Sequence, residues 1–380
     1  MFEIRSLKRK TRRWLIVGLL AVVLVGVSGC KTLNFYRQAI AGEYEMLSSQ
    51  KPVEKILADT NTPAKLKSRL EVVQQFRAFA ETDLKLPVDG HYKKFADLHR
   101  PFVVWNVEGA SEFSLEPKSW WYVWVGSLEY RGYFSQSAAE KYGAALRKEG
   151  YDVFVGGVEA YSTLGVFKDP LLNTFIYHRD ADLAEILFHE LAHQRVFARG
   201  DEDFNEAFAT TVGQEGAVRW LQKHGQQEAL DRYRADLKRN NQFVHLIMRT
   251  RADLAELFQD ERNEKGKLKS THIERRIPAA DLRQKKKAIY DRLQQQYAEL
   301  KQQWGGANDY DEWFAKNVNN AKLNSVAAYY DLLPAFQHIL QLNDGDLVKF
   351  YVEAERLSKL NRKERREWLK TVGTLEQGKP

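Results

Sequence analysis

ILFHELAHQRVFARGDEDFNEAF, residues 186–208, contains two histidines four residues apart, with a glutamate directly after the first. Its apolar residues recur at helical spacing up to a glycine, which predicts a helix that ends there. Asp182, followed by Glu185 three residues later, is expected to cap the start of this helix. Because residues four apart lie one turn above each other on a helix, His189 and His193 can bind a single metal ion.

The pattern His-Glu-x-x-His is typical of catalytic zinc sites. Neutral imidazole nitrogens are good zinc ligands, and a catalytic zinc keeps one position for water beside its three protein ligands. Glu190 projects beside the two histidines, where its carboxylate can accept a proton from that water. The sequence therefore predicts one Zn²⁺ on His189 and His193, with Glu190 as the general base. The alternative is a pair of ordinary surface histidines, which would not require a helix this apolar.

A second helix is predicted directly after the glycine, over residues 201–225. Twelve residues separate His193 from Glu206, which is enough for a loop and a return, so Glu206 can reach the same ion. Ala209, one turn later, is small enough to let the two helices approach each other. In the alternative interpretation, Glu206 only forms a capping box with Asp203. The third ligand would then be one of the neighbouring acids, Glu202, Asp203 or Glu215.

The motifs HELAHQ and NEAFA are similar to the paired motifs of gluzincin metallopeptidases, above all those of the aminopeptidase N family. Carried over by position, the resemblance implies His189, His193 and Glu206 as zinc ligands and Glu190 as general base. The whole chain, with its YRGYFS and AYSTLG segments, also resembles a bacterial family described as putative aminopeptidases. The two motifs are closer together here than in the aminopeptidase N family. The resemblance therefore supports zinc-dependent hydrolysis more strongly than it supports exopeptidase specificity.

The N-terminus has the pattern of a secretory signal peptide, since residues 5–13 are strongly basic and an apolar run follows over residues 14–27. The run is shorter than the roughly 20 residues that span a bilayer, so cleavage is predicted. VSGC, residues 27–30, resembles the lipobox of bacterial lipoproteins, in which the cysteine is acylated. The resemblance implies lipid on Cys30, the only cysteine of the chain, and contact with a membrane through this lipid.

The formal charge of +7 is mostly that of the signal peptide. Residues 1–29 contain six basic residues and one acid, which carry +5 and leave +2 for the remainder. So small an excess does not indicate nucleic acid as a partner. Lys31 stands where inner-membrane lipoproteins commonly have aspartate, so the lipobox resemblance implies a bacterial cell-envelope protein in the outer membrane, facing the periplasm.

The chain beyond the signal peptide is expected to be globular, because the sequence is 44% hydrophobic and has no low-complexity tract. Helical spacing predominates over residues 34–86 and again from residue 180 onward. In the second of these regions, Pro278 is expected to open a highly charged helix and Gly305 to close it. Residues 101–165 are instead rich in β-branched and aromatic residues, which indicates short strands around one helix at about 136–149.

The predicted fold class is therefore α+β and mostly helical. With the gluzincin resemblance, we expect a zincin-like catalytic region that combines a small mixed or antiparallel sheet with the two metal-binding helices. The predicted regions are a lipoprotein signal peptide (1–29), an N-terminal helical region (30–100), the zincin-like catalytic region (101–225) and a C-terminal helical region (226–380).

Cleavage at a free amino terminus requires an acidic group that binds the substrate amine. The aminopeptidase N family uses a glutamate in a glycine-containing strand, and this resemblance implies Glu159 in GGVEAYS, unless Glu159 is simply a solvated strand residue. A donor for the developing oxyanion is also needed. Most tyrosines of an aromatic-rich fold serve packing, and the sequence leaves the following candidates open: Tyr161, Tyr177, His178, Arg131, Tyr329 and Tyr330.

These features predict a lipid-anchored, zinc-dependent peptidase that acts on a peptide substrate, and the resemblance implies an aminopeptidase. One alternative is an endopeptidase of the cell envelope. Another is a non-enzymatic binding or assembly factor with a vestigial metal site. The presence of Glu190 beside a complete ligand set argues against a vestigial site, because a scaffold needs no general base.

Overall fold

The computed structural model describes residues 35–122, 126–160, 168–262, 268–270, 277–330 and 332–377. The chain divides into two units, Met1–Ser49 and Gln50–Pro380. In the first unit, residues 35–48 are helical, whereas the predicted signal peptide and Cys30 lie outside the described residues. Within the described ranges, no helix combines the length and the apolar character needed to cross a membrane.

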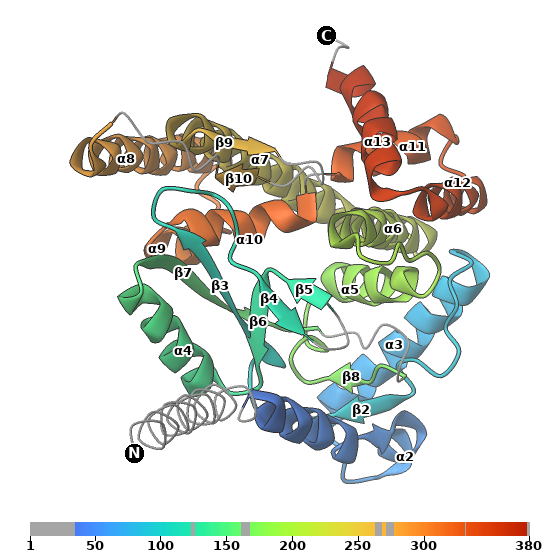
Figure 1. Ribbon diagram of the computed structural model, residues 1–380. Helices are drawn as coiled ribbons and strands as arrows, with labels where there is room; N and C mark the ends of the chain where they lie inside the picture. Colours follow the sequence, from blue (N-terminus) through green and yellow to red (C-terminus); the bar gives the residue numbers. More distant parts are fainter. Residues whose placement is uncertain are drawn as a thin grey trace, which may run out of the picture. The chain divides into compact units, whose positions relative to one another are not determined.

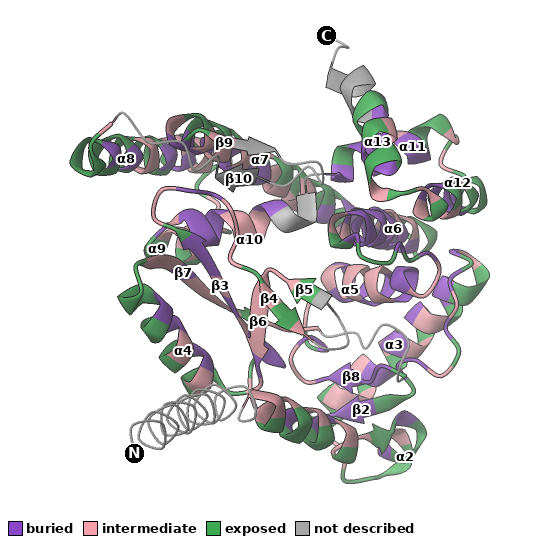
Figure 2. Ribbon diagram, viewed as in Figure 1, coloured by how far each residue is buried: buried purple, intermediate pink, exposed green. Residues whose placement is uncertain are grey.

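Two helices at the centre of the second unit, α5 (Asp180–His193) and α6 (Glu202–Lys223), lie side by side (Figure 1). Side chains from Phe204 to Leu221 are buried along most of α6, so this helix runs through the core (Figure 2). Aromatic rings on both sides of the helix pair pack against it. They include Phe76 and Phe79 of α3 (Ala64–Thr82) and Phe336 of α11 (Leu333–Leu342).

Glycines allow α5 and α6 to touch through their backbones. A Cβ atom at Gly213 would lie 2.8 Å from the backbone oxygen of Glu185 and 3.2 Å from the Cβ of His189. A Cβ atom at Gly216 would lie 2.6 Å from the ring of Phe188. The close approach that we expected at Ala209 therefore depends on glycines one and two turns further along α6.

Helix α5 begins earlier than predicted, at Asp180, and no side chain caps its first turn. It also ends earlier, at His193 and not at Gly200, because the following residues form a loop in which the N–H of Ala198 donates to the Asn205 side chain. Asp182 lies inside the first turn, where its carboxylate accepts from Arg179 at 2.7 Å and opposes the positive end of the helix dipole. Glu185 points away from the helix start and accepts from Tyr233. The predicted capping box is therefore wrong, because both of its members have stronger partners in other directions.

The main sheet is antiparallel, with strand order β6 (Tyr130–Tyr133), β3 (Val104–Ser111) and β7 (Tyr151–Val158). Helix α4 (Gln136–Lys148) packs on it and is capped by Ser135. A second sheet has β1 (Lys51–Pro52) antiparallel and β8 (Leu171–Leu172) parallel to β2 (Lys94–Ala96). The remaining short strands pair as β4 (Trp120–Tyr122) with β5 (Gly126–Leu128) and β9 (Asp260–Arg262) with β10 (Leu268–Ser270).

The C-terminal half consists almost entirely of helices. The long helices α7 (Gln227–Phe258) and α8 (Ala279–Gln303) pack against each other, and α8 follows Pro278 and precedes the left-handed Gly305 as predicted. The other helices are α2 (Val53–Ala58), α9 (Asp311–Ala315), α10 (Asn320–Tyr330), α12 (Leu347–Lys359) and α13 (Arg362–Gln377). The predicted α+β, mostly helical fold class is confirmed.

Candidate metal centre

Three side chains from α5 and α6 converge on one point. The Nε2 atoms of His189 and His193 are 3.2 Å apart. The carboxylate oxygens of Glu206 lie 3.3 Å from the Nε2 of His189 and 3.5 Å from that of His193. Among the described residues, this is the one group of three or more His, Cys, Asp or Glu side chains arranged to hold a metal ion.

The pKa shifts of His193 and Glu206 favour the unprotonated forms that bind metal, whereas the shift of His189 favours a proton that an ion would have to displace. Burial, followed by the charge of His189, lowers the pKa of His193 to about 4, so its imidazole is neutral at pH 7. Burial opposes ionisation of Glu206, but the hydrogen bond and charge of His189 outweigh it and lower the pKa of the carboxyl. Burial likewise opposes protonation of His189, and Glu206 outweighs it, so the pKa of His189 is raised. A metal cation that replaced the proton on His189 would likewise balance the negative charge of the Glu206 carboxylate.

The donor set itself fits zinc. Two imidazole nitrogens and one carboxylate form the three-ligand set of many catalytic zinc sites. The side chain of His193 is only 5% exposed, and its Nδ1 has no hydrogen-bond partner among the described residues. With both histidines presenting Nε2 to the same carboxylate, the group has the ligand types and the convergence that such an ion requires.

Polar side chains behind His189 support its position. The hydroxyl of Tyr233 on α7 donates to Glu185, one turn before His189, at 2.7 Å. Thr210 lies on α6 one turn after Glu206, with its hydroxyl 3.4 Å from the Nδ1 of His189. Polar contacts next to His189 thus connect α5 with α6 and with α7.

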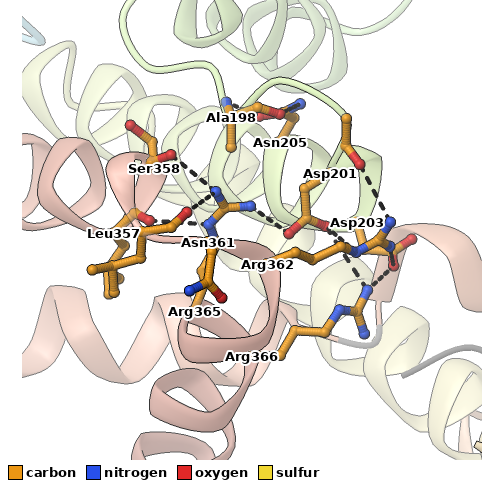
Figure 3. Close-up of polar contacts among 12 residues, drawn as sticks. Ala198, Asp201, Asp203, Asn205, Leu357, Ser358, Asn361, Arg362, Arg365 and Arg366 are labelled. Carbon is orange, nitrogen blue, oxygen red and sulfur yellow. Dashed lines mark hydrogen bonds and ion pairs between the residues drawn. The ribbon is translucent and has the colours of Figure 1, made fainter. Parts of the chain in front are cut away.

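Asn205, directly before Glu206, fastens the loop between the two helices. Its Oδ1 accepts from the backbone N–H of Ala198 at 2.7 Å, and its Nδ2 donates to the backbone oxygen of Ala198 at 3.0 Å (Figure 3). The side chain is buried. We assigned no role to Asn205 from the sequence, although its place in the NEAFA motif was the available signal.

The other acids proposed as third ligand lie outside the three-residue group. Asp203 accepts from Arg362 and Arg366, and Glu215 pairs with Arg219 at 2.7 Å. Helix α6 begins at Glu202, after an N-cap residue that makes no side-chain cap. The alternative capping box of Asp203 with Glu206 is therefore not formed, because arginines of α13 hold the Asp203 carboxylate.

Glu190 lies on α5 between the two histidines and is partly exposed. Its charge acts on the buried Tyr92, whose pKa is raised first by burial and then by Glu190. The backbone N–H of Tyr92 donates to Asp169, and the N–H of Asp169 donates to the Nδ1 of His91, so these residues form one connected segment. Tyr92 could not be predicted as a neighbour of Glu190, because it lies far from the motif in the chain.

The predicted substrate residues lie at the other end of α5. The Nε2 of His178 is 2.8 Å from the carboxylate of Glu159, and this contact raises the pKa of His178. Tyr177 is exposed, with the ammonium of Lys65 over its ring. The start of α5 is about 14 Å from His189 along the helix axis. The contacts found for Glu159 and Tyr177 among the described residues are thus with His178 and Lys65, and neither residue belongs to the group of His189, His193 and Glu206.

Of the remaining oxyanion candidates, the structure describes the side chain of Arg131. Tyr161 lies outside the described residues, as do the side chains of Tyr329 and Tyr330. Arg131 lies on β6, with its guanidinium over the ring of Tyr142. A separate groove of about 710 Å³ lies between α7 and α8, and it contains none of the predicted site residues.

Comparison with known proteins identifies the family. No curated protein and no solved structure matches the chain. The family model described as "Putative aminopeptidase" matches residues 34–369, which include α5 and α6. The chain therefore belongs to the putative aminopeptidase family, as its resemblance to that family predicted.

Proposed function

We propose that the protein is a zinc-dependent peptidase of gluzincin type that removes residues from the amino terminus of peptides. The observation that carries this proposal is the convergence of His189, His193 and Glu206 beside Glu190, in a chain that belongs to the putative aminopeptidase family. A zinc ion bound there would supply Lewis-acid chemistry that activates water and polarises the scissile carbonyl.

The protein's own residues divide the remaining work. His189, His193 and Glu206 hold the ion, and their preformed convergence keeps the cost of ordering them low. Glu190 accepts the proton of the attacking water and donates it to the leaving amine. The glycine contacts hold α5 and α6 close together around the ligands, and the Tyr233–Glu185 hydrogen bond joins α5 to α7.

Metal analysis of the purified chain without its first 30 residues, combined with a pair of peptides, tests this function. We expect about one zinc per chain, as a three-ligand site requires. A peptide with a free amino terminus should be cleaved, and its N-acetylated counterpart should not. Equal cleavage of both peptides would indicate an endopeptidase, whereas bound zinc without hydrolysis of either would indicate a binding or assembly factor.

We also propose that lipid on Cys30 anchors the protein in the bacterial cell envelope. Exchange of Cys30 for serine removes the thiol that would carry the acyl chains, so the Cys30→Ser protein is expected to leave the membrane fraction or to be misprocessed. Fractionation and the size of the mature chain measure this. A Cys30→Ser protein that is cleaved and sediments with membranes like the parent would contradict the anchor.

A further inference from the structure

A cluster of buried charges joins the C-terminal helix to the start of α6 (Figure 3). We call it the arginine clamp, and it consists of Arg362, Arg365 and Arg366 of α13 with Asp201 and Asp203. Arg365 donates to Asp201 at 2.5 Å, and Arg366 donates to Asp203. Arg362 lies 3.4 Å from Asp203 and also donates to the backbone of Gly200.

Arg365 uses all three guanidinium nitrogens. Besides Asp201, it donates to the backbone oxygens of Leu357, Ser358 and Leu360 at the end of α12. Its guanidinium also lies over the ring of Phe204 in the first turn of α6. A single side chain thus fixes the end of α12 and the beginning of α6 relative to α13.

The clamp is costly in a buried position. The side chains of Asp201, Arg365 and Arg366 are 1%, 5% and 7% exposed, and the three arginines exceed the two aspartates by one positive charge. Taking such charges out of water often costs more than their attraction returns, and apolar residues of similar volume frequently stabilise as well or better. What an ion network adds over apolar packing is a defined geometry, here of the residues where α6 begins.

That geometry bears directly on the third metal ligand. Asp203 lies about 4.5 Å before Glu206 along the axis of α6, on the same first turns of the helix. Metal–ligand distances tolerate deviations of only about 0.2 Å, so a small shift of this helix end would move the Glu206 carboxylate out of range. Among the described residues, the contacts of the clamp reach α6 and its preceding loop but not α5.

We propose that the arginine clamp makes α13 a positioning element for Glu206, and that it thereby sets the affinity of the site for zinc. This inference rests on the proposed metal site. The clamp residues do not touch the ion or the substrate; they act through the start of α6.

The test compares zinc affinity in two clamp variants of the full chain, Asp203→Asn and Arg366→Met. Zinc dissociation constants are measured by competition with a chelator, at a temperature where thermal melting shows the metal-free proteins to be folded. Both variants are expected to bind zinc about tenfold more weakly than the parent, the lower end of the effect of removing residues that orient metal ligands. Asp203→Asn keeps the shape of the side chain, so its zinc affinity still tests the inference if Arg366→Met does not fold.

Lys286→Met is the matched control. Lys286 is a nearly buried cation of α8 that binds Asp152 and the backbone of Glu112, each at 2.7 Å, on elements other than α5 and α6. This variant is expected to lower the melting temperature without changing zinc affinity. If the clamp variants also show a lower melting temperature with unchanged zinc affinity, the inference is overturned, but the proposed metal site is not. A parent protein that binds no zinc would instead overturn the metal site, and the inference with it.

Discussion

Replacing Glu190 by glutamine is expected to lower peptide hydrolysis by a factor on the order of a hundred or more, while zinc stays bound. Glutamine keeps the size and helix propensity of the side chain but cannot take up a proton. Glu190 is not a member of the three-residue ligand group, so its loss should not weaken the metal site. Steady-state rates and zinc content, measured on the same preparation, separate the two effects.

Asp182→Asn provides the control for this experiment. It also removes one carboxylate from α5, but in the first turn of the helix, where Asp182 pairs with Arg179. Its activity should stay near that of the parent. If Glu190→Gln is as active as Asp182→Asn, Glu190 is merely a residue of the helix and the proposed mechanism loses its base.

Replacing Glu206 by alanine should remove zinc and activity together. Only two imidazoles would remain, one fewer than the protein ligands of a catalytic zinc site. The Glu206 carboxylate, which offsets the cost of placing a positive charge at the buried His189, would also be lost. Zinc content after gel filtration and the rate of peptide cleavage are the two measurements, and both are expected to fall to background.

Glu215→Ala tests whether the loss of zinc and activity is specific to Glu206 or follows from removing any acidic residue of α6. Glu215 lies on the same helix and pairs with Arg219, away from the histidines, so this variant should keep both zinc and activity. If Glu206→Ala binds zinc tightly and stoichiometrically and has only a lower melting temperature, Glu206 is not the third ligand, and one of the neighbouring acids must be.

The helices around the candidate site could be predicted because their signals are local. Apolar spacing located α5, although the helix ends at His193 and not at Gly200 as predicted, and Pro278 and Gly305 bound α8 closely. The start of α5 was predicted wrongly because Asp182 and Glu185 also match a capping pattern, and their true partners lie elsewhere. Local sequence does not reveal such competition.

Contacts between distant segments could not be predicted. The sequence suggested Ala209 as a small residue between the helices but did not indicate the close contacts at Gly213 and Gly216, which depend on how the two helices cross. The arginine clamp joins residues about 160 positions apart in the chain, so helical spacing alone did not indicate it. The likeness of Glu159 to an amine-binding glutamate was likewise local, and it did not reveal the pairing with His178.

The two hydrogen bonds between Asn205 and Ala198 close the loop before Glu206 into a small ring. The entropy of bringing the carboxylate back to the imidazoles is therefore lost when the chain folds, not when an ion arrives. The side chains of His189, His193 and Glu206 would then act as one tridentate chelator, in which each ligand has a high effective concentration near the other two. An ion that lost its bond to one of these side chains would stay bound to the other two, so its dissociation would require all three bonds to be open at once.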